Sequence, residues 1–223
     1  MERKQTKYDV KTLTAMAMLT ALAYAVMAVC KIIPKVGGFL SLDAIDAVIG
    51  IGGFLFGPAA AVMMIVVEAF LEAITLSTTG WYGFVMNVLS TTLLICPAVL
   101  IYRRRGGTGR AVLGLAVGVV CRLLGMIAFN YFITPMYFHM PRAAVVDLMP
   151  MICVFNLVKG VLNAALLMLL YPPVAAALRR VGLAAPSAQV QAGERRFRFE
   201  PMVAALVVLA GAVLVVLKLL EVF

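Results

Sequence analysis

Residues 149–172 read MPMICVFNLVKGVLNAALLMLLYP, an apolar stretch long enough to cross a lipid bilayer as a helix. Three polar side chains interrupt it, Asn156, Lys159 and Asn163, and their i, i+3, i+7 spacing puts them on one face of a helix. An amide or ammonium group is costly in lipid unless it has a partner. The stretch therefore predicts a membrane helix whose polar face meets a ligand or another helix.

The rest of the chain repeats this apolar character. Of its 223 residues 64% are hydrophobic, against roughly half in a soluble domain. Apolar runs of about 20 residues recur and predict an all-α, polytopic helical membrane protein. The expected helices cover about 12–32, 44–56, 59–76, 82–102, 110–133, 149–172 (extending past the prolines at 172–173 to about 178) and 202–220. A longer loop is expected at about 134–148.

Three segments follow from this pattern. Residues 1–180 are expected to form a six-helix membrane domain, 181–200 a basic cytoplasmic linker, and 201–223 an additional transmembrane helix. Basic residues concentrate at the N-terminus, at 103–110 and at 179–198, whereas the alternate loops carry only Lys31, Lys35 and Arg142. By the positive-inside rule the N-terminus is cytoplasmic, and with seven spans the C-terminus is external. The predicted location is a bacterial cytoplasmic membrane.

Several function classes lack their motifs. There is no GxxxxGK[ST] phosphate loop, so the chain is not itself a P-loop ATPase, and no HExxH or CxxC spacing predicts a metal site. The net charge of +9 lies in short clusters beside apolar runs, which indicates cytoplasmic loops rather than nucleic-acid binding. No catalytic residue is predicted. An intramembrane enzyme, the alternative from another class, would have to use Glu68, Glu72 and Lys159.

Each polar residue inside the apolar runs has two interpretations. Lys159 either donates to a ligand carbonyl, or it snorkels or pairs with Glu68 or Glu72. Asn130 stands near the expected end of its helix, where it either contacts a ligand, or caps the helix or hydrogen-bonds a neighbouring helix. Arg122 is expected to form a structural ion pair with Glu68 or Glu72 rather than to contact substrate. Further candidates are a polar patch at Asn87, Ser90 and Thr91, and two acidic residues, Asp43 and Asp46, of which one either caps the helix at 44–56 or lines a pocket.

Small residues recur on the first helix. Ala17, Ala21 and Ala25 stand four residues apart, so they form one stripe along the helix. Such a stripe allows another helix to approach closely. It serves either internal packing or the docking of a partner protein, and spacing alone does not decide between them.

An ordered set of short motifs resembles a known family. It comprises Leu42-Asp43-Ala44-Ile45-Asp46, Phe56-Gly57-Pro58, Asn87, Asn130 with Thr134-Pro135-Met136-Tyr137, and Phe155-Asn156-x-x-Lys159. Together they resemble the riboflavin-specific S component of energy-coupling factor (ECF) transporters, over about residues 10–180.

The resemblance implies a six-helix protein that binds riboflavin from outside and has no cofactor of its own. It implies partners, namely a transmembrane T component and two cytoplasmic ATPases that power uptake. Asn130, Asn156 and Lys159 would contact the flavin, Leu40, Ser41, Leu42 and Asp43 would cover it, and Ala17 and Ala21 would dock the T component. Asn87 and Asn163 complete the predicted pocket. An S component for another vitamin or precursor remains the alternative within this class.

Overall fold

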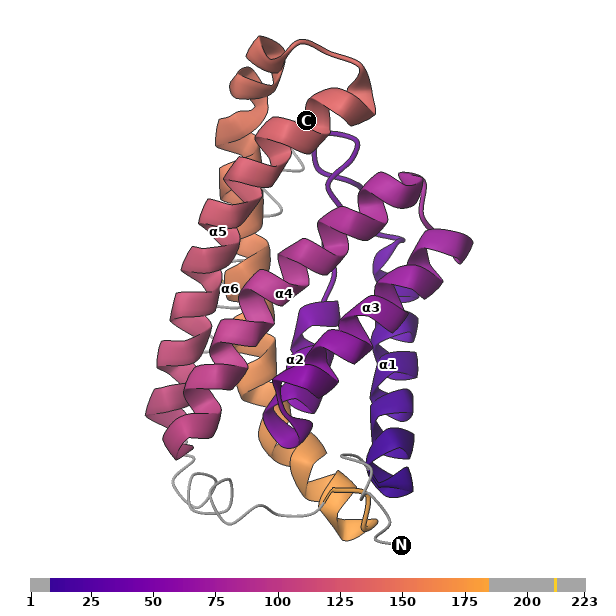
Figure 1. Cartoon of the computed structure of the whole chain (residues 1–223), viewed down its shortest axis with the longest axis vertical. Coiled ribbons are helices and arrows are strands. Elements are labelled where there is room, and N and C mark those ends of the chain that lie inside the picture. Colours follow the sequence, from indigo (N-terminus) through magenta and orange to yellow (C-terminus); the bar gives the residue numbers. More distant parts are fainter. Residues whose placement is uncertain (1–8, 185–210, 212–223) are drawn as a thin grey trace, which may run out of the picture.

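The computed structural model describes residues 9–184 and Gly211, and residues 9–184 form one bundle of helices (Figure 1). The helices are α1 (Val10–Cys30), α2 (Ile45–Phe56), α3 (Pro58–Thr75), α4 (Gly80–Arg105), α5 (Thr108–Phe138) and α6 (Arg142–Arg180). The predicted all-α fold is confirmed. Apart from Gly211, the predicted seventh helix at 202–220 lies outside the described residues, and so does most of the predicted linker at 181–200.

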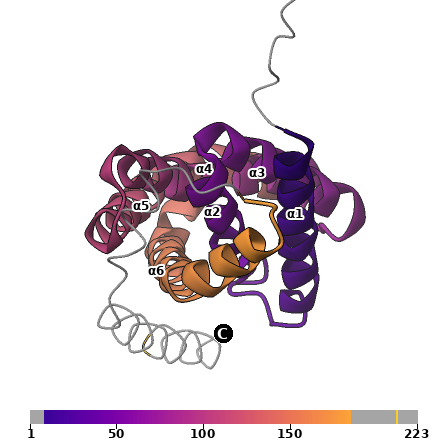
Figure 2. The ribbon, with the colours of Figure 1, turned by 90° about the horizontal axis from the view of Figure 1, so that it is seen from below.

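The short helix α2 occupies the centre of the bundle. Seen along the bundle it is surrounded by the other helices (Figure 2), and it packs against α1, α3, α4 and α6. Ten of its 12 residues are buried. At 1.5 Å per residue it is roughly 18 Å long, which is less than the bilayer core. The other five helices are long and apolar enough to cross a membrane by length and composition.

The helix boundaries agree with the predicted ones except around the link between α5 and α6. The expected loop at 134–148 is wrong: α5 continues through Pro135 to Phe138, and α6 already begins at Arg142. Prolines are tolerated inside membrane helices because neighbouring groups satisfy the freed backbone. What ends α5 is His139, whose φ of 52° is left-handed and whose N–H bonds to the Pro135 carbonyl.

Close packing joins α4 and α5. Gly114 and Gly118 face the backbone of α4 at Ala98 and Leu94, so closely that a Cβ on Gly114 would lie 2.7 Å from the Ala98 carbonyl oxygen. A Cβ on Gly118 would lie closer still to the Leu94 carbonyl oxygen. These glycines allow the two backbones to touch, as small residues do in membrane helix pairs.

Gly118→Ala is therefore expected to destabilise the bundle by about 1–3 kcal/mol, because the added methyl group must push α4 and α5 apart. Thermal denaturation in detergent measures the loss. Gly109→Ala is the matched control on the same helix, since nothing lies within 4 Å of the Cβ it adds. Equal melting temperatures for the two variants would contradict the close-packing argument.

Candidate ligand-binding pocket

A cavity opens at the end of the bundle opposite to the start of α1. It lies between the α1–α2 loop (residues 31–44) and helices α3 to α6, and it holds about 870 Å³ of space, part of it open to the outside. Apolar walls come from Phe39, Tyr82, Met86, Met126, Tyr137 and Phe155.

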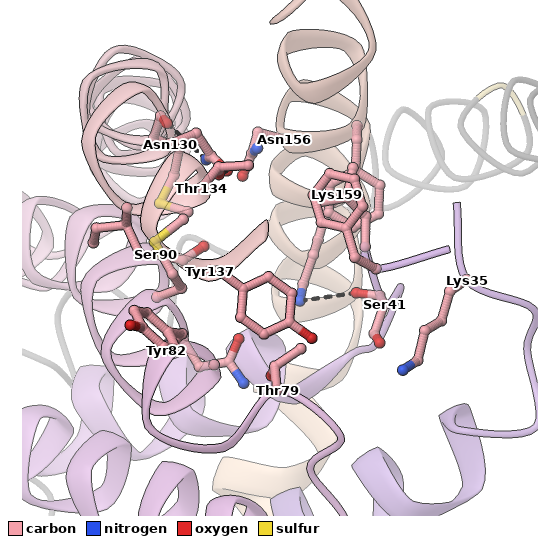
Figure 3. A pocket seen from close by; sticks show the side chains of 18 of the residues that line it. Lys35, Ser41, Thr79, Tyr82, Ser90, Asn130, Thr134, Tyr137, Asn156 and Lys159 are labelled. Carbon is pink, nitrogen blue, oxygen red and sulfur yellow. Dashed lines mark hydrogen bonds between the residues drawn. The ribbon is translucent and has the colours of Figure 1, made fainter. Parts of the chain in front are cut away.

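One polar part of the wall is shared by α5 and α6. Asn130 and Thr134 of α5 lie beside Asn156 of α6, and all three line the cavity (Figure 3). The Thr134 hydroxyl donates to Asn130 Oδ1 at 3.0 Å, and Asn130 Nδ2 donates to the Met126 carbonyl at 2.7 Å. Asn156 Nδ2 likewise donates to the Ile152 carbonyl at 2.9 Å, whereas its Oδ1 has no hydrogen bond within residues 9–184. That oxygen can accept a hydrogen bond from a ligand.

One interpretation of Asn130 is that it caps the end of its helix. The structure excludes this role. Because α5 continues to Phe138, Asn130 lies within the helix and its side chain is only 2% exposed. It lines the cavity, and its contact with a ligand stays a prediction.

Lys159 projects from α6 into the cavity and holds the α1–α2 loop. Its Nζ donates to Asp43 Oδ2 at 2.6 Å. It also donates to the Ser41 carbonyl at 3.3 Å, the bond that Figure 3 draws as a dashed line. The expected alternative, a pair with Glu68 or Glu72, is wrong, because the loop turns inward and brings Asp43 to α6. Burial raises the pKa of the Asp43 carboxyl above its ordinary value, and the Lys159 ammonium opposes that rise.

Two of the predicted binding residues do not line the cavity. The Asn163 side chain accepts from the Ala47 N–H at 3.0 Å and donates to the Asp43 carbonyl at 2.8 Å, so it clamps the start of α2. Leu42 packs against Val158 and Leu162 of α6. The other predicted residues do line it, namely Asn87, Leu40, Ser41, Asp43, Asn130, Asn156 and Lys159.

A second buried ion pair lies beside the cavity. Arg122 of α5 donates through NH1 to Asp46 Oδ2, and Thr91 of α4 donates to Asp46 Oδ1 at 2.6 Å. The expected pairing of Arg122 with Glu68 or Glu72 is wrong, because Asp46 of the central helix α2 binds Arg122 instead. Neither acidic residue caps α2 closely: the N-cap is Ala44, and Asp43 Oδ1 accepts from the Ile45 N–H only at 3.4 Å. Asp43 instead lines the pocket.

The α1–α2 loop is tied to the opposite wall. Lys31 Nζ bonds to Glu72 Oε1 at 2.6 Å, and Asn87 Nδ2 donates to Glu72 Oε2 at 2.5 Å. Lys35 Nζ donates to the Thr78 hydroxyl at 2.6 Å. Lys31, Lys35 and Glu72 all line the cavity, and sequence reasoning did not single them out for it. The lysines resemble ordinary loop charges, so their sequence carries no signal of a site.

A tight turn shapes the middle of this loop. Val36 and Leu40 exchange two backbone hydrogen bonds, of 2.9 and 3.0 Å, and Gly37 and Gly38 between them have φ of 60° and 80°. Glycine adopts such left-handed angles without the strain that other residues incur. The turn therefore fixes the position of Phe39 and Leu40 against the cavity.

The alanine stripe of α1 faces away from the bundle. Ala17, Ala21 and Ala25 are exposed, as are Met18 and Leu22 beside them. Internal packing of α1 uses another face, with Ala15, Leu19 and Ala23. Within residues 9–184 no other helix covers the stripe, which leaves it open to lipid or to a partner helix.

Comparisons with known proteins agree on one family. A family model described as "ECF transporter, substrate-specific component" matches residues 11–171. The protein named "Riboflavin transporter RibU" of Staphylococcus aureus (strain TCH60) is 27% identical over 186 residues, which cover 80% of this chain and 98% of that protein. "Riboflavin transporter FmnP" of Bacillus subtilis (strain 168) is 24% identical over 176 residues, covering 73% and 90%.

A solved structure gives the same result for the fold. The structure described as "Structure and mechanism of the S component of a bacterial ECF transporter" matches with a TM-score of 0.65 at 26% identity. The match covers 76% of this chain and 98% of the other. The cavity and the bundle around it therefore lie in the part of the chain that these proteins share.

Proposed function

The chain belongs to the family of substrate-specific components of ECF transporters, and from this premise we propose that it binds riboflavin outside the cell and delivers it inward. As a member of this family it is a multi-pass membrane transport component and not an enzyme. We choose riboflavin as the ligand because two proteins that this chain resembles over most of their length are named riboflavin transporters. The observation that carries the proposal is the cavity lined jointly by Asn130, Asn156 and Lys159.

The chemistry of the cavity suits a flavin. The dioxopyrimidine edge of a flavin presents a carbonyl, an N–H and a second carbonyl, and the cavity offers the matching groups. Lys159 is a cationic donor for a carbonyl, and Asn156 Oδ1 is an unused acceptor for an N–H. The aromatic and methionine walls suit the flat apolar part of the ring.

Titration of riboflavin into the detergent-purified chain tests this proposal. Tight one-to-one quenching of flavin fluorescence is the expected result. Absence of quenching would reject riboflavin and favour an S component for another vitamin or precursor. Thiamine and biotin, added as competitors, should leave the riboflavin signal unchanged.

We propose that partner proteins supply the energy for uptake. The exposed stripe of Ala17, Ala21 and Ala25 on α1 is where a transmembrane T component would dock, and that component would connect the chain to two cytoplasmic ATPases. In the proposed orientation the start of α1 is cytoplasmic and the cavity faces outward, in keeping with the basic residues at 103–110 and 179–180.

A further inference from the structure

The cavity continues inward past its asparagine wall, along one face of α5. Arg122, Met126, Asn130 and Thr134 follow one another at intervals of four residues, and all four line the cavity. From Thr134 to Arg122 this face is roughly 18 Å long. Arg122 is therefore at the deep end, more than a helical turn below Asn130.

At the deep end of the cavity, α4 also contributes a polar side chain to the wall. Thr91 of α4 and Arg122 of α5 bind the same Asp46 carboxylate, which puts them at the same depth. Ser90, next to Thr91, is 5% exposed and turns to the cavity, where Figure 3 shows it among the lining side chains. Thr91 itself is not part of the cavity wall.

Both deep side chains have hydrogen-bonding capacity left over. Asp46 occupies NH1 of Arg122, but the buried Nε–H of Arg122 has no acceptor among the described residues. The Ser90 hydroxyl makes no hydrogen bond within residues 9–184, although a serine in a helix can bond to the carbonyl four residues before it. A buried donor without an acceptor is costly, and a ligand oxygen at this position would remove that cost.

Contacts with α2 and α6 also hold the Arg122 side chain in place. Asp46, which itself accepts from the Thr91 hydroxyl, binds the guanidinium group, and the side-chain stem passes Gly160 of α6, where a Cβ would lie 3.6 Å from Arg122 Cδ. A donor fixed in this way costs little side-chain entropy when a ligand binds.

We propose that Ser90 and Arg122 form a deep subsite that binds an oxygen acceptor of the substrate, a carbonyl or a hydroxyl group. This subsite rests on the proposed function and deepens it, because it adds a specificity-determining pair to the site of Asn130, Asn156 and Lys159. Arg122 supplies a charge-assisted donor and Ser90 a neutral one.

Fluorescence titration of riboflavin with the full chain and three variants tests the subsite. Arg122→Lys keeps the charge opposite Asp46 but lacks the Nε–H and the planar fork, so affinity should fall about tenfold or more. Ser90→Ala should lower it about fivefold. Thr91→Val is the matched control: it loosens the same Asp46 from outside the cavity and should leave affinity within about twofold. Melting temperatures accompany each titration.

The outcomes separate the subsite from the proposed function. If the unmodified chain does not bind riboflavin, the proposed function fails and the subsite falls with it. If it binds riboflavin and Ser90→Ala binds equally well, the subsite alone is overturned; this variant leaves the Arg122–Asp46 pair intact and so decides even if Arg122→Lys does not fold. Parallel losses of affinity and melting temperature in Thr91→Val and Arg122→Lys would likewise assign Arg122 a structural role only.

Discussion

Lys159→Ala is expected to lower riboflavin affinity by about 10- to 100-fold, the largest effect of any single change in the pocket. A hydrogen bond from a charged donor contributes about 1.5–3 kcal/mol, and alanine removes it entirely. Lys159 also holds the covering loop through Asp43 and the Ser41 carbonyl, so the loop loses its attachment to α6 in the same variant. Riboflavin titration in detergent measures the loss.

Lys159→Ala should also lower the stability of the protein, and a double variant separates this loss of stability from the loss of affinity. Removing Lys159 leaves the Asp43 carboxylate buried and unpaired, and breaking such a pair costs about 3–5 kcal/mol of stability. Lys159→Ala combined with Asp43→Asn should recover the melting temperature but not the affinity. Recovery of both would mean that the single variant loses affinity only through the unpaired Asp43 carboxylate, and unchanged affinity in the single variant would exclude any role of Lys159 in binding.

Ala21→Leu is expected to abolish most uptake while leaving riboflavin affinity unchanged. Ala21 is exposed at the middle of the α1 stripe, away from the cavity, so a leucine there disturbs neither the pocket nor the core. A close helix–helix contact, in contrast, does not accommodate three further carbon atoms, and an overpacked contact loses about 1–3 kcal/mol. Uptake of labelled riboflavin by cells that also produce the T component and the ATPases should fall about tenfold or more.

Ala116→Leu is the matched control. Ala116 is exposed on α5, outside the proposed docking stripe, and receives the same added volume. Normal uptake with this variant and loss with Ala21→Leu would locate the docking surface on α1. Normal uptake with both variants would show that the stripe contacts lipid only.

Local sequence patterns predicted the helices but not how they associate. The apolar runs gave all six described helices, and the first five begin within two residues of their predicted starts. The exceptions surround Pro135 and the start of α6, where the soluble-protein rule that proline ends a helix does not hold in a membrane. Spacing also identified the polar face at Asn156 and Lys159.

Ion-pair partners, in contrast, depend on tertiary position. Glu68 and Glu72 were the natural partners for Arg122 and Lys159 because they stand within a membrane helix. The actual partners are Asp46, in the first turn of α2, and Asp43, in the loop just before it. The central position of α2 brings them to α5 and α6. Asn163 was misassigned for the same reason, since the backbone that it clamps is more than 100 residues away in sequence.

The covering loop of the pocket is anchored at both ends and folded in its middle. Lys31 fastens its beginning to α3, Asp43 fastens its end to α6, and the Val36–Leu40 turn has a defined shape of its own. Few backbone dihedral angles therefore remain to be ordered when a ligand is enclosed. Since ordering of loops is a major cost of association, this pocket should bind its ligand with a small loss of conformational entropy and release it slowly.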